Sequence, residues 1–255
     1  MKKILDIPEL KIAGIAGLPE IARGVDLGAL ITKAVAANGL RVGDGDIFVI
    51  AQKIVSKAEG RTVRLESVAP STTAREWAAK YKKDARVVEL VLRESRRMVK
   101  KEGGIIVAET KHGFVCANAG VDVSNAPLGC AILLPEDPDN SAERLKAALD
   151  KNLGLQMAVI IADTFGRPWR EGLVNVALGV AGIAPLADYR GKLDSFGRPL
   201  QATVLAVADE LASAAELVMG KSSRVPVALI QGYQYKERKG SGRELIRPAE
   251  KDLFR

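Results

Sequence analysis

The sequence predicts an α+β fold, and two observations support this class. Segments rich in Val and Ile, bounded by Gly, Asp or Pro, mix with helical segments without a regular strand–helix alternation. The strand-like segments 104–109 and 113–117 follow one another too closely for a helical crossover, which indicates adjacent antiparallel strands. With 255 residues, 47% of them hydrophobic, the chain can form one large domain or two modest ones.

The expected elements follow from hydrophobic period and from capping residues. Thr73, with Glu76 three residues later, predicts a helix start in which side-chain oxygens satisfy the free amides of the first turn. Gly220, with a proline beyond it, predicts the end of the last long helix. The predicted strands are 10–15, 46–51, 104–109, 113–117, 130–134, 157–162, 173–182 and 226–231. The predicted helices are 26–37, 73–82, 85–100, 141–150 and 203–219.

Two places are candidates for breaks in the organisation of the chain. One is the loop 134–141, which is rich in proline and acidic residues, and the other is the charged, glycine-interrupted tail after Gly232. We therefore expect a main domain over residues 1–232 and a charged surface extension over residues 233–255. No low-complexity linker separates them.

Composition narrows the classes of partner. The net charge of +7 favours anionic partners, but aromatic residues make up only 4% of the chain, and no zinc-finger or aromatic RNA-binding motif is present. We expect no nucleic-acid partner. The apolar runs are shorter than the roughly 20 residues of a membrane span, so no membrane partner is expected either. Two cysteines, Cys116 and Cys130, form no disulfide framework, which is typical of a reduced, cytoplasmic protein.

Two acidic residues stand where predicted strands end. Asp122 follows the strand-like stretch ending in CANAG, where Ala119 and Gly120 let the backbone approach a ligand, and Asp163 follows the apolar run AVIIA. With Thr164 they form a set of hard oxygen ligands suited to Mg²⁺ or Mn²⁺, with Arg167 and Arg170 close behind to hold phosphate or carboxylate oxygens. Alternatively, both aspartates only cap helices or close turns.

Other motifs point less clearly to chemistry. Residues 215–222, AELVMGKS, fit a relaxed phosphate-loop pattern, but a helix precedes the glycine and a strand follows it, which is the reverse of a phosphate-binding loop. Gly220, Lys221 and Ser222 remain candidates for phosphate contacts. The single histidine, His112, lies in a turn and cannot build a histidine-based metal site. The two cysteines lie in apolar, strand-like settings that suggest inert packing.

Six stretches, taken in order, resemble one known family. They are GLPEI, IVSKAEG, NAGVDVSN, ADTFGRPWREG, GKLDSFGRPL and ADELASAAELVMGK, and together they extend from about Leu18 to Gly232. The chain is similar to the coenzyme F-420 precursor: L-glutamate ligases, the deazaflavin γ-glutamyl ligases. This resemblance favours the metal-site interpretation of the two aspartates over the capping interpretation.

The resemblance implies a GTP-dependent ligase that adds L-glutamate to the carboxylate of the deazaflavin precursor. It implies Mn²⁺ or Mg²⁺ with K⁺, and an intertwined homodimer of two-lobed α+β subunits. By matching position, Asp122, Asp163 and Thr164 are expected to bind metal, and Lys57 joins the two aspartates as a catalytic residue. The residues expected to form the GTP site are Leu18, Pro19, Glu20, Ile21, Gln52, Lys53, Lys57, Asn125, Met219, Gly220, Lys221 and Ser222.

The chain departs from the family's pattern at Lys221. Known members carry an acidic metal ligand just after the Met-Gly pair, and a charged lysine cannot take that role. Either Lys221 neutralises phosphate charge in place of one cation, or another residue such as Glu171 supplies the ligand. Two alternatives to the main function stay open as well: the same ligase chemistry on a pterin or folate acid, or a basic nucleic-acid-binding module without activity.

Overall fold

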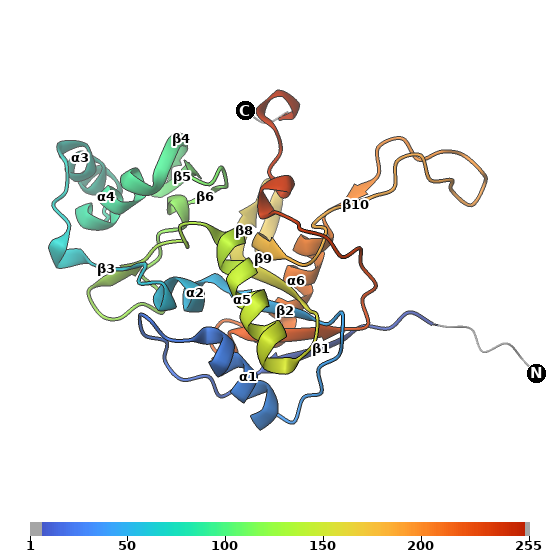
Figure 1. Cartoon of the computed structure of the whole chain (residues 1–255). Coiled ribbons are helices and arrows are strands. Elements are labelled where there is room, and N and C mark those ends of the chain that lie inside the picture. Colours follow the sequence, from blue (N-terminus) through green and yellow to red (C-terminus); the bar gives the residue numbers. More distant parts are fainter. Residues whose placement is uncertain (1–6, 253–255) are drawn as a thin grey trace, which may run out of the picture.

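A five-stranded sheet forms the centre of the protein (Figure 1). The computed structural model describes residues 7–252. Only one pair in this sheet, β2 with β8, is parallel, and the other neighbours are antiparallel. The strand order is β1 (Lys11–Ile15), β12 (Val227–Gln231), β2 (Ile47–Ala51), β8 (Ala158–Arg167) and β9 (Arg170–Ala181).

Helices cover both faces of this sheet, because successive residues of its buried strands point to opposite sides. Phe48 and Ile50 face a core shared with α1 (Leu27–Ala37) and α5 (Pro138–Leu153), whereas Ile47 and Val49 face a core shared with α6 (Val207–Met219). In Figure 1, α1 and α5 accordingly lie on one side of the sheet and α6 on the other. The central sheet is therefore the middle layer of three.

A second group of elements has its own hydrophobic cluster and lies beside the central sheet. It comprises α3 (Thr72–Tyr81), α4 (Ala85–Glu94) and an antiparallel sheet of β4 (Ser95–Glu102), β5 (Ile105–Thr110) and β6 (Val115–Ala117). A short antiparallel pair, β3 (Thr62–Arg64) and β7 (Cys130–Ile132), runs between this group and the sheet. The mixed and antiparallel sheets confirm the α+β class, including the predicted antiparallel pairing of 104–109 with 113–117.

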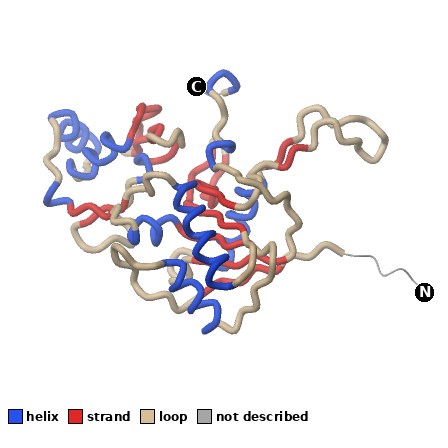
Figure 2. Tube along the Cα trace, in the orientation of Figure 1, coloured by secondary structure: helices blue, strands red, loops and turns tan. Residues whose placement is uncertain are grey.

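The remaining elements are short. The helix α2 (Gln52–Ala58) follows β2 directly, and β10 (Ala187–Asp188) pairs with β11 (Val204–Leu205) at the base of an arm that extends away from the body in Figure 2. Single 3₁₀ turns are formed by Leu65–Ser67, Asn118–Gly120, Gly242–Leu245 and Ala249–Lys251.

All eight predicted strands are present, although β8 runs to Arg167 instead of ending at residue 162, and the helix predictions need correction at four places. The helix predicted over 141–150 extends over Pro138–Leu153, so the candidate break at 134–141 lies partly in α5. The helix predicted over 85–100 ends at Glu94, and 95–102 form β4, because this stretch finds a backbone partner along β5. The helix predicted to begin at Thr73 is capped instead by Ser71, whose Oγ accepts a hydrogen bond from the Ala74 amide at 3.2 Å. The predicted helix 203–219 starts at Val207 because 204–205 pair as β11.

Part of the C-terminal tail is bound to the domain. Tyr233 and Tyr235 pack against the cluster beneath α6. Asp139, at the start of α5, accepts hydrogen bonds from Val180 N at 3.0 Å and from Gly242 N at 2.7 Å. The start of α5, strand β9 and the tail are therefore joined through one carboxylate.

Gly179 is expected to be the most sensitive glycine of this junction. A Cβ atom at this position would lie 2.1 Å from the Pro138 carbonyl oxygen. This oxygen belongs to the backbone at the start of α5, which cannot move aside cheaply. We expect Gly179→Ala to lower the free energy of unfolding by about 3 kcal/mol.

Gly43→Ala is the matched control, because a Cβ there meets nothing within 4 Å. Urea unfolding followed by circular dichroism measures both variants. Equal stability of the two would contradict the close backbone approach.

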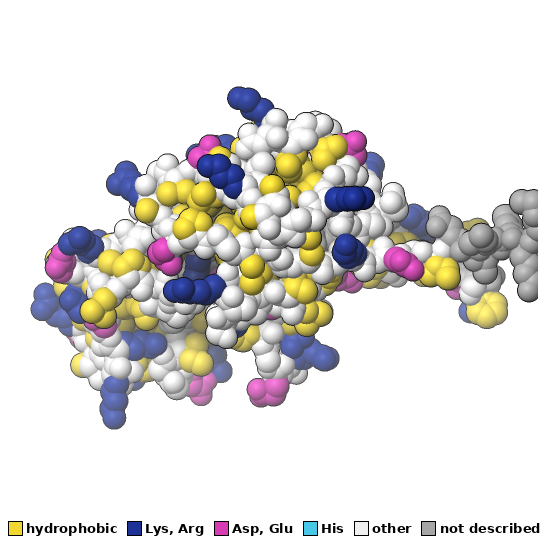
Figure 3. Space-filling model, turned by 90° about the horizontal axis from the view of Figure 1, so that it is seen from below, with side chains coloured by type: hydrophobic (Ala, Val, Ile, Leu, Met, Phe, Trp, Pro, Cys, Tyr) yellow, Lys and Arg dark blue, Asp and Glu magenta, His cyan; other side chains and the backbone are white. Residues whose placement is uncertain are grey.

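Two features of the structure bear on whether the protein binds nucleic acid or crosses a membrane. On the face shown in Figure 3, Lys and Arg are scattered among Asp and Glu rather than gathered into one basic stripe. No helix within residues 7–252 has the length and hydropathy to cross a bilayer.

Candidate active site

The candidate site forms where the parallel pairing of β2 with β8 ends. Ala51 and Ala162 are the last residues paired in this register. The sequence predicted a strand end before Asp163, but β8 continues to Arg167 along β9, so Asp163 lies within β8, beside the point where β2 ends and Gln52 begins α2. Asp122 is fixed nearby by a backbone bridge to Ile132, with N···O distances of 3.0 and 2.8 Å. Residues far apart in sequence therefore reach one place, where β2 ends beside β8.

Asp122 is held as a carboxylate by a lysine and a serine. Lys53 Nζ donates to Asp122 Oδ2 at 2.6 Å, and the amide of Ser124 donates to Oδ1 at 2.7 Å. Burial acts to raise the pKa of Asp122, but the hydrogen bonds and charge of Lys53 and Ser124 outweigh it and lower this pKa below its usual value. Asp122 is therefore ionised at neutral pH.

Asp163 lies close enough to Asp122 for the two charges to interact. Burial raises the pKa of Asp163 to about 6, and the negative charge of Asp122 acts in the same direction, against the opposing effects of the Thr164 amide, Lys53 and Lys221. A partly buried carboxylate beside a second carboxylate is an arrangement that a divalent cation stabilises.

A polar network continues from Thr164 across the β8–β9 hairpin. Thr164 pairs with Asn175 in the strand register, and its Oγ donates to Asn175 Oδ1 at 2.6 Å. Asn175 Nδ2 donates to Glu216 Oε2 at 2.9 Å. Lys221 completes the network, since its ammonium contacts Thr164 Oγ1 and lies 2.9 Å from Glu216 Oε1 and 3.5 Å from Asn175 Oδ1.

Gln52 carries a buried polar atom without a partner. The residue is 1% exposed, and its Oε1 accepts a hydrogen bond from Ser56 Oγ at 2.8 Å. Its Nε2 donor finds no partner among the described residues. Because an unsatisfied buried donor is costly, a ligand oxygen at this edge of the sheet would stabilise it.

Lys57 lies one turn after Lys53 on the short helix α2, so the two lysines share a face. Its ammonium pairs with the carboxylate of Glu20, in the loop that follows β1. This ion pair brings the loop 18–21 next to the end of α2. The predicted residues Glu20, Lys53 and Lys57 are therefore neighbours of Asp122 or of one another.

The other residues predicted to contact GTP differ in their exposure to solvent. Leu18 and Ile21 pack against the core beneath α1, and Pro19 lies between them. Asn125 is exposed and has a positive φ of 54°, in the loop after Asp122. Met219 is buried at the end of α6, Gly220 caps that helix with φ 60°, and Ser222 is exposed.

Comparisons with known proteins decide the family. The sequence model described as F420-0:Gamma-glutamyl ligase matches residues 16–232. The chain belongs to the F420-0:gamma-glutamyl ligase family. It is 47% identical to the coenzyme F420:L-glutamate ligase of Methanothermobacter thermautotrophicus over 96% of this chain and 99% of the relative. It is also 47% identical to the enzyme of that name from Methanocaldococcus jannaschii, over 84% and 86%, and 39% identical to that of Archaeoglobus fulgidus, over 96% of each.

The metal set expected for this γ-glutamyl ligase fold fits the donors present. Asp122 and Asp163 offer carboxylate oxygens whose mutual repulsion a divalent cation would relieve, and Thr164 adds a hydroxyl beside them. Within residues 7–252, no group of three or more His, Cys, Asp or Glu side chains is placed to hold a metal. The set therefore consists of two carboxylates and a hydroxyl, and ligand or water oxygens would complete the coordination.

Glu171 is not the carboxylate that meets Lys221. It lies exposed near the tip of the β8–β9 hairpin, four residues along β9 from Asn175, or about 13 Å. The carboxylate that pairs with Lys221 is that of Glu216, a residue that the sequence analysis missed. Asn175 and Ser124 were missed too, although a polar residue within the apolar strand β9 is a signal that could have identified Asn175.

Several motifs set aside from the sequence have the expected structure. The GKS segment follows a helix and precedes a strand, so it does not form the strand–loop–helix motif of a P-loop. His112 lies in the β5–β6 turn, where its Nε2 is 2.9 Å from the Pro135 carbonyl oxygen. Burial raises the pKa of the Cys116 thiol to about 12, which leaves it protonated and unreactive, as its packed setting predicted.

Proposed function

We propose that this protein is a GTP-dependent ligase that adds L-glutamate to the carboxylate of the deazaflavin precursor of coenzyme F-420. The observation that carries this proposal is the meeting of Asp122, Asp163 and Lys53 at one edge of the sheet, beside the unpartnered Gln52 amide. Membership in the γ-glutamyl ligase family, with relatives named for this reaction, supports the choice of acceptor and amino acid.

The reaction proceeds in two steps. An oxygen of the acceptor carboxylate attacks the γ-phosphorus of GTP, the bond from that phosphorus to the bridging oxygen breaks, and GDP leaves. The resulting acyl phosphate has a good leaving group. The glutamate amine then attacks the acyl carbon, phosphate departs, and the amine loses a proton to solvent as the amide forms.

The residues contribute position and charge. Asp122, Asp163 and Thr164 would hold a divalent cation, Mn²⁺ or Mg²⁺, which screens phosphate charge when bound. Lys53 and Lys57 add fixed positive charge on one face of α2, where the crowded oxygens of GTP and acceptor would otherwise repel one another. The unpartnered Nε2 of Gln52 would donate to a nucleotide oxygen, and K⁺ is proposed as a further cofactor.

The remaining nucleotide contacts are proposed from two loops. The loop Leu18, Pro19, Glu20 and Ile21 is held beside α2 by the Glu20–Lys57 ion pair. Asn125 follows Asp122 in its loop. The other loop is the segment Met219, Gly220, Lys221 and Ser222. Its position near Asp163 is inferred from the effect of the Lys221 charge on the pKa of that residue. We also propose a homodimer of two-lobed subunits, as the family resemblance implies.

Lys221 is proposed to act as a built-in cation. Its ammonium pairs with Glu216 and lies against Thr164 Oγ1, so it supplies positive charge where a second metal ion would otherwise be placed. The side chain is 63% exposed, so the charge can still face a phosphate. We expect the wild-type protein with GDP to bind one Mn²⁺ per chain and Lys221→Glu to bind a second.

Electron paramagnetic resonance counts free Mn²⁺ in this titration, and Lys33→Glu, an exposed lysine on α1, provides the charge-matched control. Two ions bound to the wild-type chain would contradict the role of Lys221 while leaving the ligase proposal intact.

The decisive experiment for the function is a product analysis. The protein is incubated with GTP, Mn²⁺, K⁺ and L-glutamate, together with the deazaflavin precursor or with a pterin or folate acid. We expect the precursor to gain glutamate by mass spectrometry, with GDP formed in proportion. A product only from another acid would change the acceptor but keep the chemistry. GTP left unhydrolysed, together with tight salt-dependent nucleic-acid binding, would overturn the enzyme proposal.

A further inference from the structure

A cavity lies at the other end of α6 from the candidate active site. It encloses about 500 Å³ and is lined by β10, the base of the arm and the tail segment 233–238. Val207, the first residue of α6, lines it, whereas Lys221 lies just beyond the last residue of that helix. The 13 residues of α6 span about 20 Å, so the cavity is separate from Asp163 within one chain.

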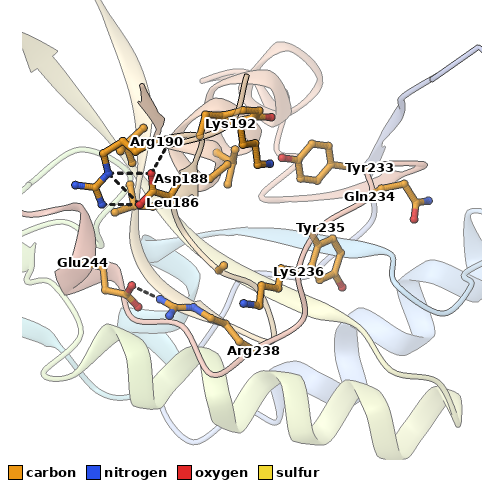
Figure 4. Close-up of a pocket in the computed structure, with 15 residues that line it drawn as sticks. Leu186, Asp188, Arg190, Lys192, Tyr233, Gln234, Tyr235, Lys236, Arg238 and Glu244 are labelled. Carbon is orange, nitrogen blue, oxygen red and sulfur yellow. Dashed lines mark hydrogen bonds and ion pairs between the residues drawn. The ribbon is translucent and has the colours of Figure 1, made fainter. Parts of the chain in front are cut away.

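The cavity has an excess of positive charge. Four basic side chains line it, Arg190, Lys192, Lys236 and Arg238, against the two carboxylates of Asp188 and Glu244. Each carboxylate already pairs with an arginine, as the dashed lines in Figure 4 show.

Two lysines carry the charge that these pairs leave over: one is Lys192, whose ammonium lies 4.4 Å from the centre of the Tyr189 ring, and the other is Lys236. The Lys236 ammonium has no ion pair or hydrogen bond within residues 7–252. Because like charges gathered in one cavity repel each other, this lining favours an anion.

One wall of the cavity is aromatic. The rings of Tyr233 and Tyr235 lie 6.4 Å apart, with an angle of 14° between their planes. Burial raises the pKa of Tyr233, and burial raises the pKa of Tyr235 to about 12, so both hydroxyls remain donors at neutral pH. Ring faces and hydroxyl donors together suit a planar group that carries oxygen atoms.

We propose that this cavity binds a planar heterocycle carrying an anionic phosphate or carboxylate, independently of the GTP site. The tyrosine rings would pack against the heterocycle, while Lys236 and its basic neighbours would hold the anion. In Figure 4 the labelled Lys236 lies between Tyr235 and Arg238, which places the free charge beside the aromatic wall.

The test uses FMN as a probe, because it joins a planar ring system to a phosphate and is fluorescent. Riboflavin supplies the ring alone, inorganic phosphate the anion alone, and AMP a purine in place of the flavin ring. We expect quenching of FMN fluorescence on binding, with a Kd roughly tenfold below that of riboflavin. Comparing FMN with AMP separates a flavin-type ligand from a nucleotide.

Two charge-matched variants locate the binding. Lys236→Gln should raise the Kd of FMN roughly tenfold and leave that of riboflavin unchanged. Arg198→Gln, in the arm but outside the cavity, should leave both unchanged. Equal effects of the two variants, equal affinity for FMN and riboflavin, or no FMN binding would overturn the proposal.

GDP with Mn²⁺ is titrated on the same proteins by calorimetry. Displacement of FMN by GDP would place FMN in the nucleotide site and overturn the proposal. FMN binding without GDP binding would leave this cavity intact while contradicting the proposed ligase.

Discussion

Asp163→Asn is expected to abolish glutamate ligation while making the metal-free protein more stable. Asparagine keeps the shape and one acceptor oxygen but removes the negative charge that a divalent cation requires. We expect turnover to fall by roughly a thousandfold, equivalent to about 4 kcal/mol of lost charge stabilisation. Release of GDP and of the glutamylated product measures this loss. Circular dichroism and a thermal melt then establish that the variant is folded.

The gain in stability follows from the direction of the pKa shift. Burial raises the pKa of Asp163 to about 6 in the folded protein, from an ordinary value of 3.8. The protonated carboxyl is therefore favoured by the fold, and its contribution to stability is present below about pH 4 and lost as the pH rises through about 6. The asparagine side chain of the variant does not titrate, so the variant avoids a loss of up to about 3 kcal/mol.

Melting temperatures of the metal-free proteins at pH 4 and pH 8 test the direction of this change in stability. The advantage of Asp163→Asn over the wild-type protein should be small at pH 4 and larger at pH 8. Asp44→Asn is the control, since Asp44 Oδ1 accepts a hydrogen bond from Gln156 N at 2.8 Å and asparagine retains that oxygen. A variant that keeps most of its turnover would contradict the role of Asp163 as a ligand.

The sequence identified Asp163 but not its setting. An apolar run followed by a polar residue predicted a strand end at residue 162, whereas β8 continues to Arg167, because the residues after Ala162 pair with β9. The parallel pairing that brings Gln52 to the same edge could not be read from the sequence, because register is a long-range property of two strands. The resemblance to known ligases supplied that information indirectly.

The network around Lys221 was not predictable for a different reason. Glu216 lies on a helix whose acidic residues look like an ordinary solvated face, and Asn175 lies in the neighbouring strand. Only the packing of α6 against β9 brings them together. The prediction of a helix continuing to residue 100 was wrong for a similar reason, since the segment after Glu94 forms a strand by pairing with β5. Local sequence patterns therefore predicted helices and strands better than they predicted which residues of different elements contact one another.

Lys53→Met is the second substitution with a large expected effect, because Lys53 interacts with both aspartates. Its ammonium donates to Asp122 Oδ2 at 2.6 Å and to Ser124 Oγ at 2.8 Å, and its charge lowers the pKa of Asp163. Methionine removes the charge but keeps an unbranched side chain. We expect the metal-free protein to lose about 2 kcal/mol of stability, since two carboxylates are left facing each other.

The outcome with Mn²⁺ distinguishes this electrostatic role from simple packing. Without Lys53, the carboxylates of Asp122 and Asp163 lose a competing cation, so Mn²⁺ should raise the melting temperature of Lys53→Met more than that of the wild-type protein. Turnover should still fall by roughly a hundredfold, because a fixed charge beside the phosphates is lost. Lys33→Met, on the exposed side of α1, should change neither quantity. Equal stabilisation of the wild-type protein and Lys53→Met by Mn²⁺ would mean that the lysine and the metal do not share the same two carboxylates.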